Sequence, residues 1–132
     1  RLLKKQLEKK INKMIVYRSF RFHSARHLPN LNDEHICKQT HGHTFNLTIY
    51  IKGEINNKDG FVIDFFDIDK IFNKYVHSKI DHKVLNDVKG LDNPTSEYLA
   101  KWIWDNLSPH IAILDKIKVS EDHGTGIIYS PK

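Results

Sequence analysis

The residues best suited to chemistry in this sequence are Cys37, His41 and His43, which lie within one short segment. Residues two apart project to the same side of an extended chain, so the two imidazoles would face one way. Gly42 between them leaves room for the backbone and a metal ion to approach closely. Two such imidazoles form half of a zinc site, because Zn²⁺ binds histidine nitrogen at about 2.0–2.1 Å. The thiol of Cys37 could be a ligand, a base or a nucleophile beside them.

Three further side chains are of types suited to acid–base work or ligand recognition. Asp81 precedes His82 in a short link between predicted helices, and a carboxylate can orient an imidazole and stabilise its charged form. Adjacent residues rarely hydrogen-bond each other directly, so we expect the partner of each to lie elsewhere. Glu121 precedes a glycine-containing turn, where it could accept paired hydrogen bonds from the N–C–N edge of an amidine-like ring. The alternatives are a buried, unreactive Cys37 and solvated positions for the other three.

Composition limits the classes of protein to consider. The 132 residues, of which 39% are hydrophobic, suit one domain with a real core. No apolar run approaches the ~20 residues that span a membrane, and the Lys-rich N-terminus does not resemble a signal peptide. A single cysteine excludes an internal disulfide and suits a reducing compartment, so we expect a cytoplasmic protein.

The charge balance indicates either an anionic ligand or simply a soluble surface rich in lysine. The formal net charge is +5, which attracts nucleic acid, a membrane face or a phosphorylated metabolite. The lysines are scattered and are not interleaved with aromatic residues, so nucleic acid is not specifically favoured. Nine histidines are more than a domain of this size needs for packing, which indicates that some of them act in chemistry.

The elements that must position these residues begin with two strands. Residues 15–24 are β-branched and aromatic without breakers, and they predict a strand. Residues 26–42 contain proline, asparagine, aspartate and glycine and predict a long, functional loop. Residues 43–51 alternate, so His43 heads a buried row. The members of that row are Phe45, Leu47, Ile49 and Ile51.

The remaining chain predicts two helices and two closing strands. One helix starts at Asp64 and buries a stripe of Phe65, Ile68, Phe72 and Val76. The second starts at 93–96 and runs to about Leu107. Its expected buried residues are Leu99, Trp102, Ile103 and Leu107. Residues 113–121 and 126–130 predict strands.

The order of elements predicts an α+β fold. It is a four-stranded antiparallel sheet with two helices on one face, and it leaves two open edges that can pair with other subunits. We assign residues 15–132 to this single domain. Residues 1–14 form an N-terminal extension, and residues 1–13 read as a short amphipathic helix.

Several ordered motifs together resemble the 6-pyruvoyl-tetrahydropterin synthase family, over about residues 16–130. The segment at 93–105 is especially similar to the family's bacterial branch in the queuosine pathway. The motifs are C-x-x-x-H-G-H at 37–43, G-F-V-I-D-F at 60–65, I-D-H at 80–82, L-N-D-V at 85–88, G-L-D-N-P-T-S-E at 90–97, and Glu121 before a glycine turn.

The resemblance implies a tunnelling fold, in which three subunits form one barrel, two trimers stack into a hexamer, and active sites lie between subunits. It also implies roles for individual residues. These are Cys37 as the catalytic thiol, Asp81 and His82 as the catalytic pair, His41 and His43 as zinc ligands, Glu121 as the pterin anchor, and Thr95 and Ser96 near the pterin ring.

The reaction that the resemblance implies starts from 7,8-dihydroneopterin triphosphate. It yields 6-carboxy-5,6,7,8-tetrahydropterin, acetaldehyde and triphosphate, with Zn²⁺ as cofactor. The pyruvoyl branch of the family, which stops after triphosphate elimination, is the first alternative. A non-enzymatic zinc or nucleic-acid binding module and a thiol hydrolase built on Cys37 are the others.

The sequence departs from the family at the third zinc histidine. Arg26 occupies the expected position, whereas His27 is one residue late and His23 is three early. Strict alternation places Arg26 on the same face as the preceding phenylalanines and both histidines on the other. A bulge or an early strand end could bring His27 back, so we predict His27 as third ligand ahead of His23. The alternative is a zinc site completed by water, substrate or another residue, or one that binds metal weakly.

Overall fold

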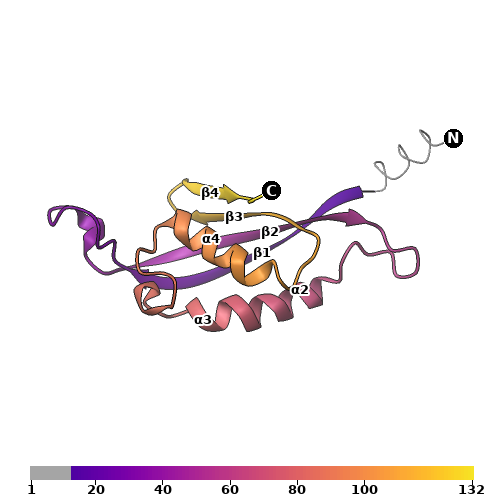
Figure 1. Cartoon of the computed structure of the whole chain (residues 1–132), viewed down its shortest axis with the longest axis horizontal. Helices are drawn as coiled ribbons and strands as arrows, with labels where there is room; N and C mark the ends of the chain where they lie inside the picture. Colours follow the sequence, from indigo (N-terminus) through magenta and orange to yellow (C-terminus); the bar gives the residue numbers. More distant parts are fainter. Residues whose placement is uncertain (1–12) are drawn as a thin grey trace.

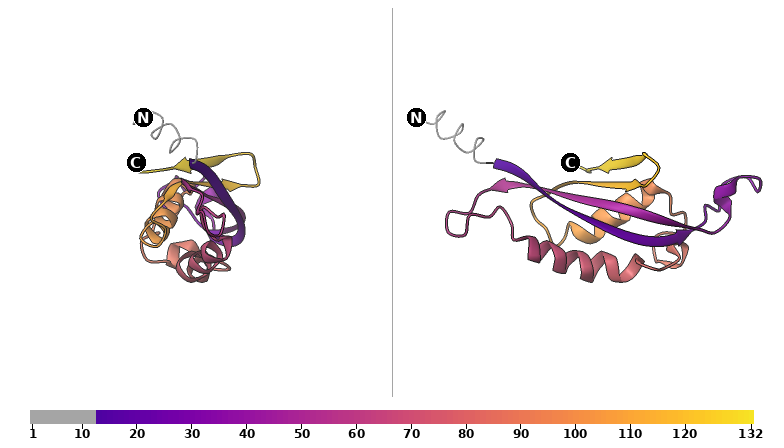
Figure 2. Two further views of the ribbon diagram at one scale, coloured as in Figure 1. Left: turned by 90° about the vertical axis from the view of Figure 1, so that its right-hand side faces the viewer. Right: turned by 180° about the vertical axis from the view of Figure 1, so that it is seen from behind.

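The computed structural model describes residues 13–132, which form one antiparallel sheet with helices on one face (Figures 1 and 2). The four strands lie side by side in chain order, which confirms the predicted α+β architecture. They are β1 (Lys13–Arg26), β2 (His41–Glu54), β3 (Leu114–Glu121) and β4 (Gly126–Tyr129). The helical segments are η1 (Ile36–Lys38), α2 (Phe65–Phe72), η2 (Asn73–His77), α3 (Ser78–Ile80), η3 (Leu85–Asp87) and α4 (Ser96–Leu107).

The two long strands extend beyond their predicted ends. β1 and β2 each have 14 residues, and their pairing continues to Arg26 opposite His41. The predicted loop is therefore confined to residues 27–40. The buried row of β2 is confirmed, because Phe45, Leu47 and Ile49, like Ile51, are fully buried. Figure 2 shows the helices against this face of the twisted sheet.

The first helical stretch runs almost continuously from α2 through η2 to α3. Its buried residues recur every fourth position, at Ile68, Phe72, Val76 and Ile80. The predicted core position of Phe65 is wrong, since this side chain is 45% exposed. The same four-residue spacing, continued from Ile68 toward the N-terminus, reaches the N-cap Asp64. Phe65 therefore lies beside the buried stripe and not in it. The segment η2 is a π-helical turn, a form frequent at functional sites.

The second helix, α4, starts and ends close to the predicted residues. Thr95 is its N-cap, and the side-chain oxygen accepts a hydrogen bond from the Tyr98 N–H at 3.2 Å. Trp104 rather than Trp102 lies in the core, because Trp104 shares a helix face with Ala100 and Leu107. Trp102 packs at the edge of the core and its indole N–H donates to the carbonyl of Lys89 at 3.1 Å.

Three expectations remain, which concern the N-terminal extension, membrane-spanning helices and the edges of the sheet. Of the helix predicted for 1–13, only Lys13 belongs to the described residues, and it begins β1. Within residues 13–132, we find no helix with the length and apolar character needed to cross a bilayer. The outer strands β1 and β4 form the two sheet edges, as expected.

Candidate active site

The candidate site lies on the helix-covered face, where β1 ends and β2 begins. Arg26 pairs with His41 across the two strands, and Ser24 pairs with His43. Side chains at alternate positions share a face, so Arg26 lies with the core side chains and is itself buried. Its side chain is only 7% exposed, although arginine is rarely buried without a charged partner. The alternation predicted this placement.

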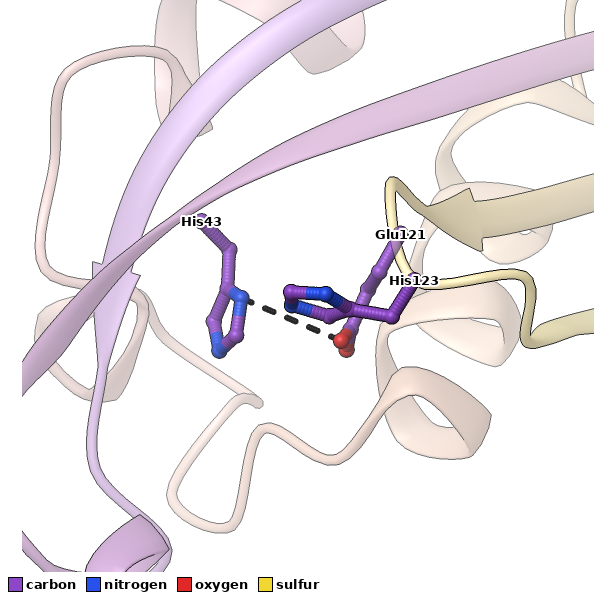
Figure 3. A group of neighbouring side chains, drawn as sticks. All are labelled: His43, Glu121 and His123. Atoms are coloured by element: carbon purple, nitrogen blue, oxygen red, sulfur yellow. Dashed lines mark ion pairs between the residues drawn. The ribbon is translucent and has the colours of Figure 1, made fainter.

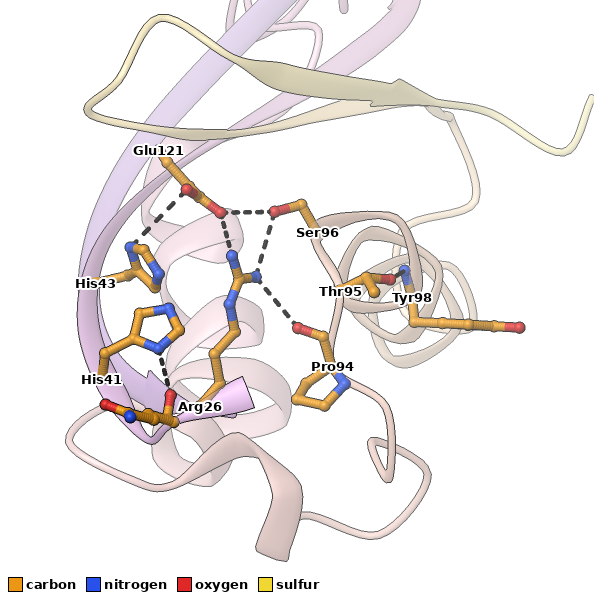
Figure 4. Close-up of polar contacts among 9 residues, drawn as sticks. Arg26, His41, His43, Pro94, Thr95, Ser96, Tyr98 and Glu121 are labelled. Carbon is orange, nitrogen blue, oxygen red and sulfur yellow. Dashed lines mark hydrogen bonds and ion pairs between the residues drawn. The ribbon is translucent and has the colours of Figure 1, made fainter. Parts of the chain in front are cut away.

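The charged partner of Arg26 is Glu121, at the end of β3 (Figure 4). Arg26 Nη2 donates to Glu121 Oε1, and Nη1 donates to the carbonyl of Pro94 at 3.1 Å. The Ser96 hydroxyl donates to the same carboxylate oxygen at 2.9 Å. Burial pushes the pKa of Glu121 upward, but the Ser96 and Arg26 contacts together outweigh it, so the pKa lies below its usual value. Glu121 is therefore an ionised, largely buried carboxylate.

Two imidazoles lie next to this pair with nitrogen atoms available. The rings of His41 and His43 are 4.4 Å apart between centroids. His41 Nδ1 lies 2.6 Å from the carbonyl of Gln39, so this nitrogen carries a proton, and Nε2 is the nitrogen of this ring that could bind a metal. His43 Nε2 is buried, and within residues 13–132 it has no hydrogen-bond partner. Burial, followed by the charge of Arg26, lowers the pKa of His43, which keeps its ring neutral and able to bind a metal.

A third imidazole, that of His123, lies near His43 (Figure 3). One ligand atom from each of His43, His123 and Glu121 fits within 4.8 Å of the others, and His43 Nδ1 is 3.8 Å from Glu121 Oε2. Nitrogen and carboxylate donors suit zinc. Sequence reasoning missed His123, whose only signal was its position two residues after Glu121 in the β3–β4 turn.

The structure places the two predicted third ligands elsewhere. His27 follows the end of β1, and its ring Nε2 lies 3.4 Å from the amide nitrogen of Asn86. The backbone N–H of His27 also donates to Asn86 at 3.0 Å. His23 is exposed on the opposite face, 3.0 Å from the hydroxyl of Thr44. Arg26 is thus the residue of this segment that contacts Glu121.

The predicted pair Asp81 and His82 is assembled, but not in the expected way. We expected each to have its partner elsewhere, and this is wrong, because His82 Nδ1 bonds to Asp81 Oδ2 at 2.7 Å. The backbone of His82 has a φ of 55°, in the left-handed region, which turns its side chain back toward its neighbour. Asp81 also accepts the His23 N–H at 3.0 Å and lies 3.3 Å from His77 Nε2.

These contacts set the charge of Asp81. Burial is the largest influence and pushes its pKa upward, but the His23 N–H and the His82 ring outweigh it. The pKa of Asp81 therefore lies below its usual value, and the group is an anion that orients the His82 ring. That ring is 76% exposed and can exchange protons with a bound molecule.

One cleft connects the two groups of histidines. It is open to solvent and has a volume of about 430 Å³, and His43, Gly42, His82 and Lys83 are among its lining residues. Lys83 supplies an exposed positive charge beside His82. A molecule in this cleft can contact an imidazole of each group and a cation.

Cys37 lies apart from this cleft, in η1 of the loop over 27–40, which extends beyond the end of the sheet in Figure 1. Its backbone N–H donates to His35 Nδ1 at 3.0 Å, and its carbonyl accepts from Leu28 at 2.8 Å. Within the described chain no hydrogen bond joins the thiol to Asp81 or His82. The remaining predicted residues differ in role, because Thr95 caps α4 while Ser96 contacts Glu121.

Comparison with known proteins identifies this architecture. Residues 15–132 match the profile of the family described as 6-pyruvoyl tetrahydropterin synthase. A 6-carboxy-5,6,7,8-tetrahydropterin synthase from Synechocystis sp. is 35% identical over 97 residues, which cover 70% of this chain and 74% of the relative. The protein of the same name from Bacillus subtilis is 29% identical over 121 residues, covering 83% and 80%.

Solved structures agree on the fold. The 6-pyruvoyl tetrahydropterin synthase of Caenorhabditis elegans superposes with a TM-score of 0.83 at 22% identity, over 91% of this chain and 96% of that one. The four-stranded sheet with helices on one face is therefore the tunnelling fold. The chain belongs to the 6-pyruvoyl tetrahydropterin synthase family.

Proposed function

We propose that this protein is a zinc-dependent 6-carboxy-5,6,7,8-tetrahydropterin synthase, a lyase of queuosine biosynthesis. It takes up water and converts 7,8-dihydroneopterin triphosphate to the carboxytetrahydropterin, acetaldehyde and triphosphate. The observation that carries this proposal is the cleft lined by both His43 and His82 in a chain similar to synthases of that name. Lys83 in the same cleft is suited to contact the triphosphate.

The zinc ion would be held by His41, His43 and His123. The hydrogen bonds from Arg26 and Ser96 both end on Glu121 Oε1, so Oε2 is the carboxylate oxygen that lies beside His43 and His123. Bound zinc would supply Lewis acidity toward side-chain oxygens of the substrate. Alanine variants decide the third ligand. We expect His123→Ala to lose zinc and His27→Ala to retain it in elemental analysis, and the opposite result would identify His27, the residue predicted from the sequence, as the third ligand.

The protein's own groups would move the protons. Cys37, as thiolate, would remove a proton from a carbon acidified by the neighbouring oxygen, and His82 would return protons as general acid with Asp81 holding its ring. Glu121 would anchor the pterin ring through its N–C–N edge, with Ser96 beside it. Cys37→Ala should therefore abolish turnover while zinc and fold are retained.

The working enzyme would be a cytoplasmic homo-oligomer, from trimer to hexamer, that needs neither membrane nor nucleic acid. Two features support this assembly. The sheet has open edges at β1 and β4, and exposed apolar side chains such as Tyr17 and Ile128 lie on them. The thiol of Cys37 also lies on a loop that extends away from its own chain's cleft, so a site between subunits would bring the two together.

Product identification tests the proposal directly. The zinc-loaded protein is incubated with 7,8-dihydroneopterin triphosphate and the products are analysed by mass spectrometry, with Cys37→Ala as control. Carboxytetrahydropterin and acetaldehyde support the proposal, and a pyruvoyl product favours the other branch. Absence of pterin turnover together with salt-sensitive RNA or DNA binding would indicate a binding module. Turnover that survives chelation would indicate a thiol enzyme.

A further inference from the structure

Arg26 presents to Glu121 the same chemical group that the pterin ring would present. A guanidinium is a planar N–C–N array of donors, as is the edge of a pterin that bears its amino group. Arg26 Nη2 donates to the carboxylate of Glu121, and Nη1 lies 3.1 Å from the Pro94 carbonyl and 3.3 Å from the Ser96 hydroxyl. A carboxylate, a carbonyl and a hydroxyl are the acceptors that such a ring edge needs.

The guanidinium is also shielded from water and lies beside an aromatic side chain, as a bound heterocyclic ring would be. The side chains of Arg26 and Glu121 are 7% and 13% exposed, so the contact is largely shielded from water. The central guanidinium carbon lies 5.2 Å from the centroid of the Phe45 ring, a distance typical of cation–π contact. The polar partners come from β3 and from the start of α4, so they are fixed by separate elements.

The contact is incomplete as a structural ion pair. Arg26 Nε is buried and, within residues 13–132, lacks a hydrogen-bond acceptor. A buried donor without an acceptor is destabilising, and burying an ion pair brings a desolvation penalty that often cancels its attraction. Packing alone therefore gives a weak reason for a charged side chain here.

We infer that Arg26 is an internal occupant of the Glu121 subsite and that a ligand with an N–C–N donor edge must displace it to bind. The identity of that ligand as a pterin rests on the proposed function. The carboxylate, carbonyl and hydroxyl acceptors around the guanidinium do not depend on that function. Arg26 would then set selectivity, because only a ring that regains all of these hydrogen bonds competes with it.

The first test measures binding of neopterin, which lacks the triphosphate, to the full chain with zinc present. Arg26→Met keeps an unbranched apolar stem but removes the donors. We expect it to bind neopterin at least about tenfold more tightly than the wild type, since a charge-assisted contact no longer competes. Adding Glu121→Gln to this variant should remove the gain.

Arg21 offers a matched control. It lies on the same strand and bonds to Asp122, next to Glu121, but this pair is exposed to solvent. Arg21→Met should therefore leave neopterin affinity at the wild-type value. An equal gain in both variants would show that net charge, and not occupancy of the subsite, controls binding.

A second measurement uses the wild-type protein and does not depend on how the variants fold. The ¹⁵N resonances of the Arg26 guanidinium, assigned by their loss in Arg26→Met, should shift and exchange faster at saturating neopterin. Unchanged resonances at saturation, or unchanged affinity of a folded Arg26→Met, would overturn the inference. Tighter neopterin binding without turnover of the triphosphate would instead reject the proposed reaction and leave the inference intact.

Discussion

A strained residue lies at the centre of the proposed proton-transfer pair. His82 adopts a φ of 55°, a region that costs a non-glycine residue about 1–2 kcal/mol. This conformation allows Asp81 to bond the ring of its immediate neighbour, while the His82 N–H donates to the carbonyl of His23 at 2.6 Å. Strain of this kind persists where the surrounding structure fixes it, and it is frequent at functional sites.

Replacing His82 by glycine and by alanine separates strain from side-chain contacts. Both variants lose the ring, and both should lose turnover. Because glycine adopts positive φ readily, we expect His82→Gly to be more stable than His82→Ala by about 1 kcal/mol in urea unfolding. Equal stability of the two variants would show that the backbone at this position is not strained.

The lowered pKa of Asp81 predicts a loss of stability in acid. A carboxyl group with a folded-state pKa below its unfolded value stabilises the fold at pH values above the unfolded value, about 3.9. That contribution is lost as the pH falls through the lowered pKa. Asp81→Asn should therefore unfold with a weaker acid dependence than the wild type between about pH 5 and pH 2. Asp105→Asn, at an exposed carboxylate of α4, is the matched control for the loss of one negative charge.

For single residues, the sequence predicted which face of a strand a side chain occupies better than it predicted which residue that side chain contacts. Alternation placed Arg26 on the buried side, but its partner Glu121 is 95 residues away and nothing local indicated the pairing. The direct bond between Asp81 and His82 depends on a backbone conformation that histidine rarely adopts. His123 was missed because its proximity to His43 arises from pairing between β2 and β3.

At the scale of elements, periodicity predicted all the strands and both helical stretches in the correct order. The errors lie where tertiary contacts override the local pattern. β1 and β2 continue through polar residues because each strand satisfies the other's backbone hydrogen bonds. Trp102 and Trp104 are the same residue type two positions apart, so the sequence alone does not decide which of them is buried. The face of α4 that packs against the sheet is the one that carries Trp104.

The β3–β4 turn determines the positions of both Glu121 and His123, and Gly124 closes it with a φ of +82°. A methyl group added at Gly124 would meet nothing within 4 Å, so the cost of Gly124→Ala comes from the backbone alone. We expect it to destabilise the fold by about 1 kcal/mol and to weaken zinc binding through His123. Both effects are measured by urea unfolding and zinc titration of the same preparation.

Gly42 is the matched control for that experiment. An added methyl group there also meets nothing within 4 Å, but Gly42 is not among the described glycines with positive φ. Gly42→Ala should therefore have nearly wild-type unfolding free energy. A comparable loss of stability in both variants would show that the added methyl group itself, and not the left-handed backbone, is the cause.

At the scale of the whole molecule, one chain does not bring together all the groups that the proposed reaction needs. His82 lines the cleft with His43, whereas Cys37 lies on the loop that extends beyond the sheet (Figure 1). Open edges at β1 and β4 provide surfaces for assembly. In the proposed assembly, a site shared between subunits would take Cys37 from one copy and His82 from another.

Mixing two inactive variants tests this arrangement. Cys37→Ala and His82→Ala should each be inactive alone, because every site then lacks one of the two groups. If each site takes Cys37 and His82 from different chains, random mixing of equal amounts should leave about one quarter of the sites intact and restore about that fraction of wild-type turnover. Native mass spectrometry verifies that mixed oligomers have formed. Mixed oligomers without any activity would place both groups in the same chain and require the loop over 27–40 to close onto its own cleft.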